Sequence, residues 1–334
     1  MTAKELPLAD PIAFGYHFYA FPLAVMGTDD RSRDWILSNY IHLAYDESPG
    51  SPVPFCFCLY DYAISPWLEV VRANRDWING TGVDPVRFCR DAIDAGYYVY
   101  LNLDDYYVPS RPGYGVRNGS HDILLCGLDD AARTFSTFGF TKEDVIRRST
   151  IGFEQLRLAY RSLDVVPNWC PQVYLYRVRQ DASYDFNFRL VRRSFEDYLN
   201  GANVSIPFEM FQPAWTRRYG IDSYAPLQEY LADYVAGKAE YSIHFLHVLW
   251  EHKRLMRQRL DRMAELLGDD LAELATEGRS LEKQAFQLRN RMLFREMSGK
   301  ASEFGPAQVE QLSRMRDVEQ RVLEQAVELL RDRR

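Results

Sequence analysis

Two carboxylates and a histidine mark the stretch where side chains able to do acid–base chemistry are densest. Asp104 and Asp105 follow residues 97–103, an aromatic and β-branched run that is typical of a β-strand. His121 stands just before the apolar run 123–126, across a loop rich in proline and glycine. A histidine at a strand mouth can act as a general base while a neighbouring acid holds its tautomer. The pattern predicts a catalytic pair of His121 and Asp104, although a histidine that only caps a strand would look the same.

The elements that must position these side chains read as an antiparallel sheet with helices, so the expected fold class is α+β. Residues 134–140 are expected to form the partner strand of a hairpin, because Asp129 and Asp130 favour a turn before them. Asp84 and Pro85 open a helix as N-cap and first helical residue. Further helices are expected at 35–43, 152–163 and 194–199, and further strands at 54–64, 173–178 and 186–191.

The second half of the chain reads as helical from residue 224 onward. Apolar residues recur at heptad-like spacing on both sides of a break at 298–306, a pattern typical of a helical hairpin or a dimerisation arm. The run 251–263 is basic on one side and could meet an acidic carrier protein, although most such runs are solvated faces. We expect an N-terminal domain at 1–165, a mixed strand and helix connection completing its core at 166–222, and a helical C-terminal domain or homodimer arm at 223–334.

Length and composition limit the classes of protein that this chain can be. Its 334 residues, 47% hydrophobic and 14% aromatic, suffice for one large or two ordinary globular domains. A net charge of −7 without a long basic run argues against nucleic acid or an anionic membrane as partner. There is no cationic leader and no run of about 18 apolar residues, so neither secretion nor a membrane span is indicated.

The cysteines and the clustered histidines favour neither a disulfide framework nor a metal site. Five cysteines without framework spacing suggest reduced thiols in a cytoplasm. Cys56 and Cys58 share one face of an expected strand, but no second pair accompanies them. His244 and His247 share a helix face without a Glu-x-x-His pattern, so a core or interface position is favoured. We therefore expect no metal and no cofactor.

Several short motifs carry a resemblance to a known family. LNLDDYYVP and HDILLCGLDD enclose the tyrosine-bearing loop, and FEQLRLAY (153–160), SFEDYLNGAN (194–203) and YGIDSYAPLQEYL (219–231) follow. Together they resemble the papain-like family of the butirosin-biosynthesis acyltransferases, which is related in fold to the bacteriocin-processing cysteine peptidases. The similarity extends over most of residues 11–262.

This resemblance implies a papain-like antiparallel sheet with an N-terminal helix, and a function in antibiotic or other natural-product assembly. The implied reaction moves an acyl group from an acyl or peptidyl carrier-protein thioester to a small amine or peptide. His121 matches the family's catalytic histidine and Asp104 its strand-end aspartate. We also expect substrate contacts from four aromatic side chains, His17, Tyr19, Tyr106 and Tyr107, although such residues are more often packed in a core.

The chain departs from the family pattern at the nucleophile and at the third catalytic position. Segment 16–27 contains no cysteine or serine, and Pro22 is expected to limit any helix there to one that starts near it. Segment 134–140 offers no Asp or Asn. Cys58 and Cys126 are possible replacements, but both look like core strand positions.

Three functions therefore stay open. The first is an acyltransferase that uses His121 as base without a cysteine nucleophile. The second is a catalytically inactive relative whose cleft binds a carrier protein, a peptide or a paralogous enzyme. The third is another enzyme, such as a hydrolase, that uses a tyrosine-rich cleft made by Tyr97, Tyr98, Tyr100, Tyr106, Tyr107 and Tyr114.

Overall fold

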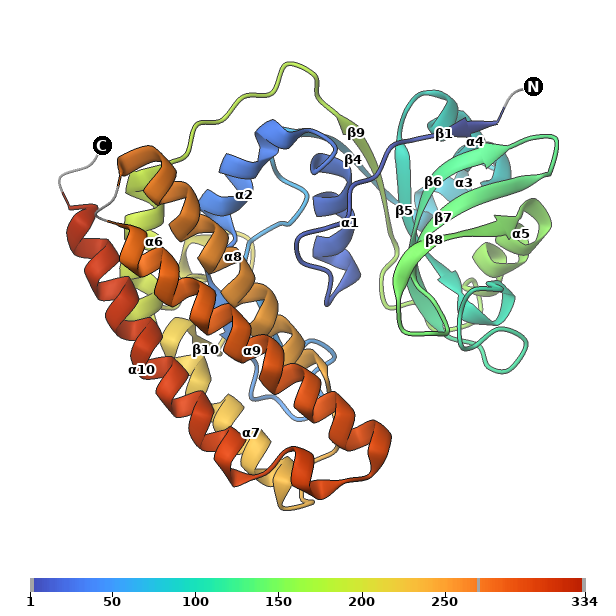
Figure 1. The fold of residues 1–334 in the computed structure, drawn as a ribbon. Helices are drawn as coiled ribbons and strands as arrows, with labels where there is room; N and C mark the ends of the chain where they lie inside the picture. The colour runs from blue at the N-terminus through green and yellow to red at the C-terminus, as the bar shows by residue number, and fades with distance from the viewer. Residues whose placement is uncertain (1–2, 269–270, 332–334) are drawn as a thin grey trace. The chain divides into compact units, whose positions relative to one another are not determined.

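A computed structural model describes residues 3–268 and 271–331 and shows an α+β protein with a helical C-terminal region (Figure 1). The chain divides into two compact units that are not contiguous in sequence. The first unit contains residues 1–32 and 62–183, and the second contains residues 33–61 and 184–334. We describe each unit by itself.

The first unit is built on a seven-stranded sheet in which every pair of neighbouring strands is antiparallel. The strand order is β4-β9-β5-β6-β7-β8, and β1 pairs with the far end of β6. The strands are β1 (Lys4–Glu5), β4 (Leu68–Asn74), β5 (Tyr98–Asp104), β6 (Ser120–Asp129), β7 (Thr134–Phe140), β8 (Ile146–Gly152) and β9 (Gln172–Val178).

The hairpin expected from the sequence is present at the centre of this sheet. β7 occupies the predicted residues 134–140, and β5 is displaced by one residue from the predicted 97–103. In the register of β5 and β6, Leu103 stands opposite His121 and Asn102 stands opposite Asp122. His121, the histidine predicted to be catalytic, is therefore the second residue of β6.

Helices cover both faces of the sheet (Figure 1). The N-terminal helix lies on the face where Phe21 meets the Tyr100 ring of β5, with 5.1 Å between ring centroids. Asp84 caps its helix as predicted, because its carboxylate accepts from the backbone N–H groups of Val86 and Arg87. The helices of this unit are α1 (His17–Met26), α3 (Arg75–Gly80), α4 (Pro85–Asp94) and α5 (Phe153–Ser162), with 3-10 turns η1 (Asp30–Ser32) and η2 (Asp105–Tyr107).

The expectation that Pro22 would set the start of the first helix is wrong. The helix begins five residues earlier at His17, and Pro22 lies inside it. A proline removes one backbone N–H and so deprives the carbonyl of Phe18 of its helical partner. Every residue of α1 except Phe18 is buried, and this burial stabilises the helix despite the missing bond.

The second unit is mainly helical and carries a small antiparallel sheet in the order β10-β2-β3. The strand predicted at 186–191 is wrong, because these residues enter helix α6, where Asn187 caps the backbone N–H of Leu190. Its elements are α2 (Arg33–Asn39), β2 (Leu43–Tyr45), β3 (Phe55–Phe57), α6 (Phe188–Leu199), η3 (Ile206–Phe208), β10 (Arg218–Tyr219), η4 (Gly220–Ser223), α7 (Tyr224–Val235), α8 (His244–Leu267), α9 (Ala272–Ser298), η6 (Ala301–Glu303) and α10 (Pro306–Leu329).

The C-terminal apolar stripes are buried inside this unit. α9 packs on α8, and α10 packs on α9, α6 and α7. The predicted break is confirmed, since α9 ends at Ser298 and α10 starts at Pro306. Leu288 and Met292 on α9, and Leu312 and Met315 on α10, are shielded from solvent. This arrangement is the helical hairpin that the heptad-like spacing predicted as one of two possibilities.

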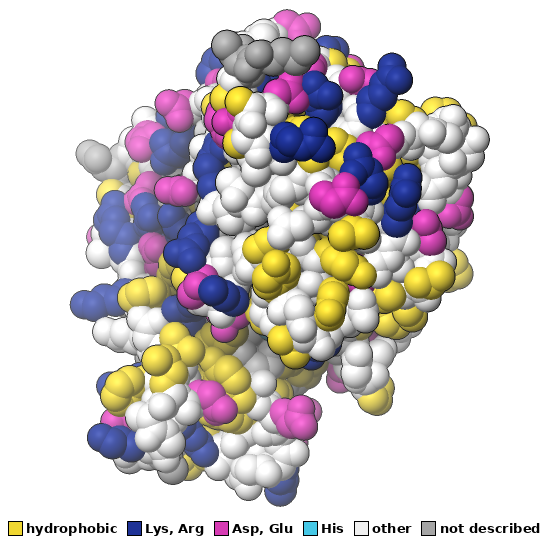
Figure 2. All heavy atoms as spheres, turned by 90° about the vertical axis from the view of Figure 1, so that its right-hand side faces the viewer, with side chains coloured by type: hydrophobic (Ala, Val, Ile, Leu, Met, Phe, Trp, Pro, Cys, Tyr) yellow, Lys and Arg dark blue, Asp and Glu magenta, His cyan; other side chains and the backbone are white. Residues whose placement is uncertain are grey.

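One face of the protein mixes charges and apolar groups (Figure 2). On the face shown in Figure 2, Lys and Arg side chains lie between Asp and Glu side chains, and hydrophobic side chains form clusters among them. Among the described helices, none combines the length and the apolar character required to cross a membrane.

Candidate active site

His17 occupies the first position of α1 and is held by two hydrogen bonds that define its tautomer. Its Nε2 lies 2.9 Å from the backbone nitrogen of Phe140, at the end of β7. A backbone N–H can only donate, so Nε2 accepts and the ring proton is on Nδ1. Nδ1 then donates to Oδ1 of Asp122 at 2.8 Å. Burial lowers the pKa of His17 below its usual value, although Asp122 acts in the opposite direction, so we assign this imidazole as neutral.

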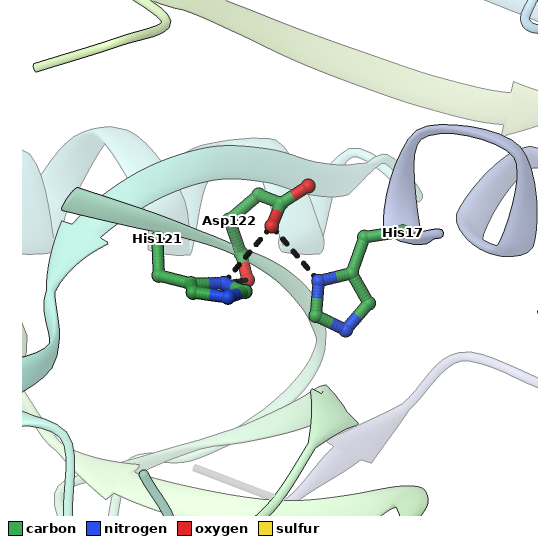
Figure 3. Close-up of side chains that lie close together, drawn as sticks. All are labelled: His17, His121 and Asp122. Atoms are coloured by element: carbon green, nitrogen blue, oxygen red, sulfur yellow. Dashed lines mark hydrogen bonds and ion pairs between the residues drawn. The ribbon is translucent and has the colours of Figure 1, made fainter. Parts of the chain in front are cut away.

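His121 stands beside the same carboxylate but remains accessible. Its Nδ1 lies 3.0 Å from Oδ1 of Asp122 and 3.5 Å from the backbone carbonyl oxygen of the same residue, and its side chain is 45% exposed. Both oxygens can only accept, so Nδ1 carries the ring proton. Figure 3 shows both imidazoles directed at one carboxylate, with His17 coming from α1 and the other two residues from β6. Within the described parts of the chain, no hydrogen bond reaches Nε2 of His121. A ring that donates through Nδ1 keeps a lone pair on Nε2, which is the form that accepts a proton.

The Asp122 carboxylate organises the site. Burial would raise the pKa of Asp122, but interaction with His17 and hydrogen bonds from both imidazoles hold it well below its usual value. Its second oxygen, Oδ2, accepts from the Tyr100 hydroxyl at 3.1 Å. Asp122 is therefore an ionised, acceptor-only group that fixes the orientation of His121.

Arg111 joins the strands that carry these groups. Its buried guanidinium donates to the carbonyl of Phe140 at 2.6 Å and to the backbone carbonyl of Asp122. A side chain at Gly139 would place its Cβ 3.3 Å from Arg111 Nη2 and 3.4 Å from His17 Nε2. The guanidinium of Arg111 and the imidazole of His17 both approach the backbone here, which explains a glycine at this point of β7.

Asp104 performs a different task from the one that the sequence predicted. Its carboxylate accepts from the backbone N–H groups of Tyr106 and Gly119, and from the side chains of Asn118 and Ser162. The bond from Tyr106 caps η2, the bonds from Asn118 and Gly119 close the loop 105–119, and the bond from Ser162 links Asp104 to α5. The place next to His121 that we expected Asp104 to fill is taken by Asp122.

Asp122 escaped the sequence reasoning for a physical reason. Successive residues of a strand point to opposite faces, so the residue next to His121 is a poor candidate for contact with it. Here both residues sit at the mouth of β6, where the half-exposed imidazole turns back to the neighbouring carboxylate (Figure 3). The signal available in the sequence was the His-Asp pair itself.

The three tyrosine candidates lie in different surroundings. Tyr19 is fully buried in α1, where its ring meets those of Tyr16 and Phe18 edge-on. Tyr106 and Tyr107 form η2, with their rings 5.0 Å apart, and Tyr106 is partly exposed. η2 also carries Asp105, whose pKa is raised by burial against the opposing charges of His121 and Arg111. The two tyrosines of η2 are therefore joined to a loop that adjoins the base, whereas Tyr19 is a core residue.

A cysteine that the sequence reasoning passed over lies near the site. Cys170 precedes β9 and is partly exposed, and its backbone N–H donates to Asn168 at 3.2 Å. Burial raises the pKa of its thiol, and the charge of Asp122 raises it further. By contrast, Cys126 is buried on β6, and Cys58 is buried in the second unit. Cys170 is thus a protonated thiol close to the carboxylate, not an activated thiolate.

The same three side chains have the composition of a metal site, but their hydrogen bonds favour another role. One ligand atom from each of His17, His121 and Asp122 lies within 4.8 Å of the others, and two histidines with a carboxylate can bind Zn²⁺ or Fe²⁺. Binding through Nδ1 of His17 would move its proton to Nε2, which faces the N–H of Phe140. The geometry of His17, Asp122 and His121 therefore fits a hydrogen-bonded triad better than a metal site.

Of the other histidine pair, His244 and His247 on α8, His247 is held by protein contacts. His247 Nε2 lies 3.2 Å from Glu251, and its Nδ1 accepts from Arg289 at 2.9 Å. Both ring nitrogens therefore have protein partners within the second unit.

No family model matches this chain, and a search of curated proteins found no significant match. The functional argument therefore depends on the geometry of the site and on the motifs described above.

Proposed function

We propose that this protein transfers an acyl group from a carrier-protein thioester to an amine, with His121 as general base. The observation that carries this proposal is the His121 and Asp122 pair. An ionised carboxylate holds Nδ1–H of the imidazole and leaves the Nε2 lone pair on a half-exposed ring. Such an imidazole can remove a proton from an attacking nucleophile.

The reaction needs only one proton acceptor. The amine nitrogen attacks the thioester carbonyl, a C–N bond forms, and the C–S bond breaks. Nε2 of His121 takes the proton that the nitrogen loses and returns it to the departing thiolate of the carrier. Because thioester aminolysis proceeds without an enzyme-bound intermediate when both reactants are held together, the absence of a cysteine at the start of α1 is compatible with it.

A papain-like arrangement is part of this proposal. It is supported by a histidine on an antiparallel strand whose ring faces the first turn of a helix, with 5.4 Å between the rings of His121 and His17. The motifs around Asp104 and His121 support the same family. Asp122 would then serve as the orienting acid for His121.

The test is acyl transfer from a loaded carrier protein to a panel of amines, followed by mass spectrometry of the product. His121→Ala should lower kcat/KM by at least about 100-fold, because a general base contributes factors of this order. The exposed Arg147→Ala, which alters a surface ion pair with Glu143, is the matched control. Activity of His121→Ala within a few-fold of wild type would remove the catalytic role.

A second function is favoured by the first turn of α1. His17 stands where a papain-like nucleophile would be expected, and both of its ring nitrogens are already bonded. An inactive relative that keeps the cleft for binding a carrier protein or a paralogous enzyme would show this feature. Binding of loaded carrier without turnover of any amine would favour this alternative.

Intact-mass spectrometry separates direct transfer from a covalent route. We expect no acyl adduct on the protein after mixing with loaded carrier, because the thiol of Cys170 is protonated at neutral pH. An adduct that disappears in Cys170→Ala would contradict direct transfer and make Cys170 the nucleophile.

A further inference from the structure

Asp105 is a carboxylate near the base, and within the described residues its oxygens accept no hydrogen bond. Its ion pair is with Arg111, whose Nε lies 3.7 Å from Oδ1, which is too long for a hydrogen bond. The neighbouring Asp104, by contrast, accepts four hydrogen bonds. An ionised carboxylate has about four acceptor positions. Asp105 therefore keeps its capacity to accept hydrogen bonds for a ligand.

The carboxylate of Asp105 is open to solvent. Its side chain is 16% exposed. Its oxygens are not among the fully buried polar atoms that lack a hydrogen-bond partner, so each of them touches solvent. The side chain of His121 is 45% exposed. A small molecule that enters from solvent can thus reach both groups.

The strand register places Asp105 on the same face of the hairpin as His121. The N–H of Asp105 donates to the carbonyl of Gly119 at 2.9 Å, so the pairing of β5 with β6 continues one residue beyond the end of β5. Leu103 stands opposite His121 and two residues before Asp105. Residues two apart on a strand point to the same face. Asp105 is therefore a diagonal cross-strand neighbour of His121.

Electrostatics and a chain of contacts agree with this placement. Among the charges that act on Asp105, that of His121 has the largest effect, ahead of that of Arg111. Arg111 also donates to the backbone carbonyl of Asp122, whose oxygen lies 3.5 Å from Nδ1 of His121. Among the described residues, no hydrogen bond or ion pair joins Asp105 directly to His121. A ligand nitrogen placed between them would therefore displace no existing bond.

The charges at this place favour a cation as the ligand. The acidic and guanidinium side chains that interact here are three carboxylates and two guanidinium groups, namely Asp104, Asp105, Asp122, Arg111 and Arg117. The carboxylates are in excess, so an anion would be repelled. Burial opposes the ionised form of Asp105, and a bound cation would offset this cost.

We propose that Asp105 binds the acceptor amine as an ammonium ion, beside the base that deprotonates it. This inference rests on the proposed acyl transfer. At neutral pH an alkyl amine is almost entirely protonated and has no free lone pair. Asp105 binds this cation by a charge-assisted hydrogen bond. Nε2 of His121 then takes one of its protons, which frees the lone pair for attack on the thioester.

The protons balance in this scheme. The ammonium gives one proton to Nε2 of His121, the C–N bond forms, and the C–S bond breaks. The imidazolium returns this proton to the departing thiolate of the carrier. The nitrogen loses its second proton to the same imidazole, which releases it to solvent, and the amide keeps the third.

The first experiment compares two acceptors that differ in charge, with loaded carrier as donor at neutral pH. n-Butylamine is a cation under these conditions, whereas trifluoroethylamine is largely neutral because its fluorine atoms withdraw electrons. Asp105→Asn should raise KM for n-butylamine by at least about tenfold, as expected for a lost hydrogen bond between charged groups. KM for trifluoroethylamine should change by less than about twofold, since it brings no charge to the carboxylate. Equal changes for both amines, or no change for either, would overturn the proposal.

Three further measurements show whether charge or folding causes the effect. Asp105→Glu keeps the charge and should recover most of the affinity for n-butylamine. Asp144→Asn removes a carboxylate from an exposed turn and is the matched control. Asp105→Asn should fold, because Arg111 still donates to the carbonyls of Phe140 and Asp122. Circular dichroism melting curves report the folding of each variant.

A binding measurement keeps this proposal separate from the reaction. In a ¹H–¹⁵N NMR titration without carrier, n-butylamine at neutral pH should shift the backbone amide signals of Asp105 and Tyr106, and trifluoroethylamine should shift them less. If wild type forms no product with any amine but these shifts occur, the acyl-transfer proposal fails and the ammonium site stands. If product forms and the shifts are absent, the ammonium site fails and acyl transfer stands.

Discussion

At the scale of single residues, the site depends on one carboxylate with two imidazole donors. Oδ1 of Asp122 accepts from His17 and His121, but only His121 has a nitrogen left for chemistry. His17 acts through Asp122 and is a positioning residue. The two histidines therefore differ in function because one of them also bonds to the backbone of β7.

Replacing the Asp122 carboxylate should remove the basic nitrogen of His121. In Asp122→Asn, the amide can present an NH₂ group to His121, so the imidazole proton moves to Nε2 and the base is lost. We expect kcat/KM for acyl transfer to fall by at least about 100-fold, measured with loaded carrier and a primary amine. Asp144→Asn is the matched control, since this exposed turn residue has a positive φ of 54° that asparagine tolerates. A fall below about fivefold would show that Asp122 does not orient the base.

At the scale of elements, caps and loop closures set where each helix and strand begins. Asp104 caps η2 and accepts three further hydrogen bonds from the loop end and α5, and Asp84 caps the start of α4. Each aspartate accepts from two backbone N–H groups at the start of a helix or in a loop, and each also binds side chains from elsewhere in the chain. Asp84 and Asp104 are thus structural carboxylates.

The cap of α4 offers a direct measure of this effect. Asp84→Ala removes the acceptor for Val86 and Arg87 and the ion pair with Arg157 at 2.7 Å. We expect the free energy of unfolding to fall by about 1 to 2 kcal/mol, measured by urea denaturation. Asp91→Ala on the same helix breaks only an exposed pair with Arg87 and should cost less than about 0.5 kcal/mol. Equal losses in the two variants would refute a capping role.

At the scale of the whole molecule, the second unit is held by a buried ion pair. Lys253 Nζ lies 2.5 Å from Oε1 of Glu319, and Tyr198 and Tyr224 donate to the same carboxylate. The pair joins α8 to α10 and sits where solvent does not reach. Burial lowers the pKa of Lys253, while Glu319 opposes the shift.

Breaking this pair from one side should be costly. Glu319→Ala leaves a buried ammonium group without its counter-charge, and we expect a loss of about 3 to 5 kcal/mol in the free energy of unfolding. The double variant Lys253→Met with Glu319→Ala removes the isolated charge and should recover a large part of that loss. Urea denaturation of the three proteins gives the comparison, and a double variant no more stable than the single one would contradict this account.

Histidines whose pKa is lowered in the folded protein make its stability depend on pH. Burial lowers the pKa of His42 to about 4 from an ordinary 6.5, and it lowers those of His17 and His252 as well. Below about pH 6.5 these histidines therefore bind protons in the unfolded chain but stay neutral in the folded protein. The free energy of unfolding should be constant in this respect above pH 6.5 and fall as the pH drops from 6.5 toward 4. Urea titrations across this interval would show it, and His42→Phe should make the dependence shallower.

The sequence by itself determined the elements whose signals are local. Residues 134–140 alternate as a strand, and Asp84 with Pro85 opens a helix, because periodicity and capping involve neighbours in the chain. The histidine at the mouth of β6 was found in the same way. Where local patterns were ambiguous, at 186–191, a strand was expected and a helix formed.

Only the tertiary structure decided which groups meet at His121. His17 lies 105 residues before Asp122, and the backbone N–H that sets its tautomer lies 123 residues after His17. Asp104 was nearer to the pattern of a catalytic acid, but donors from the following loop and from Ser162 of α5 occupy its oxygens. A carboxylate binds the donors that packing brings to it, and the distances between those donors in space are set by the whole sheet and α1, not by their spacing in the sequence.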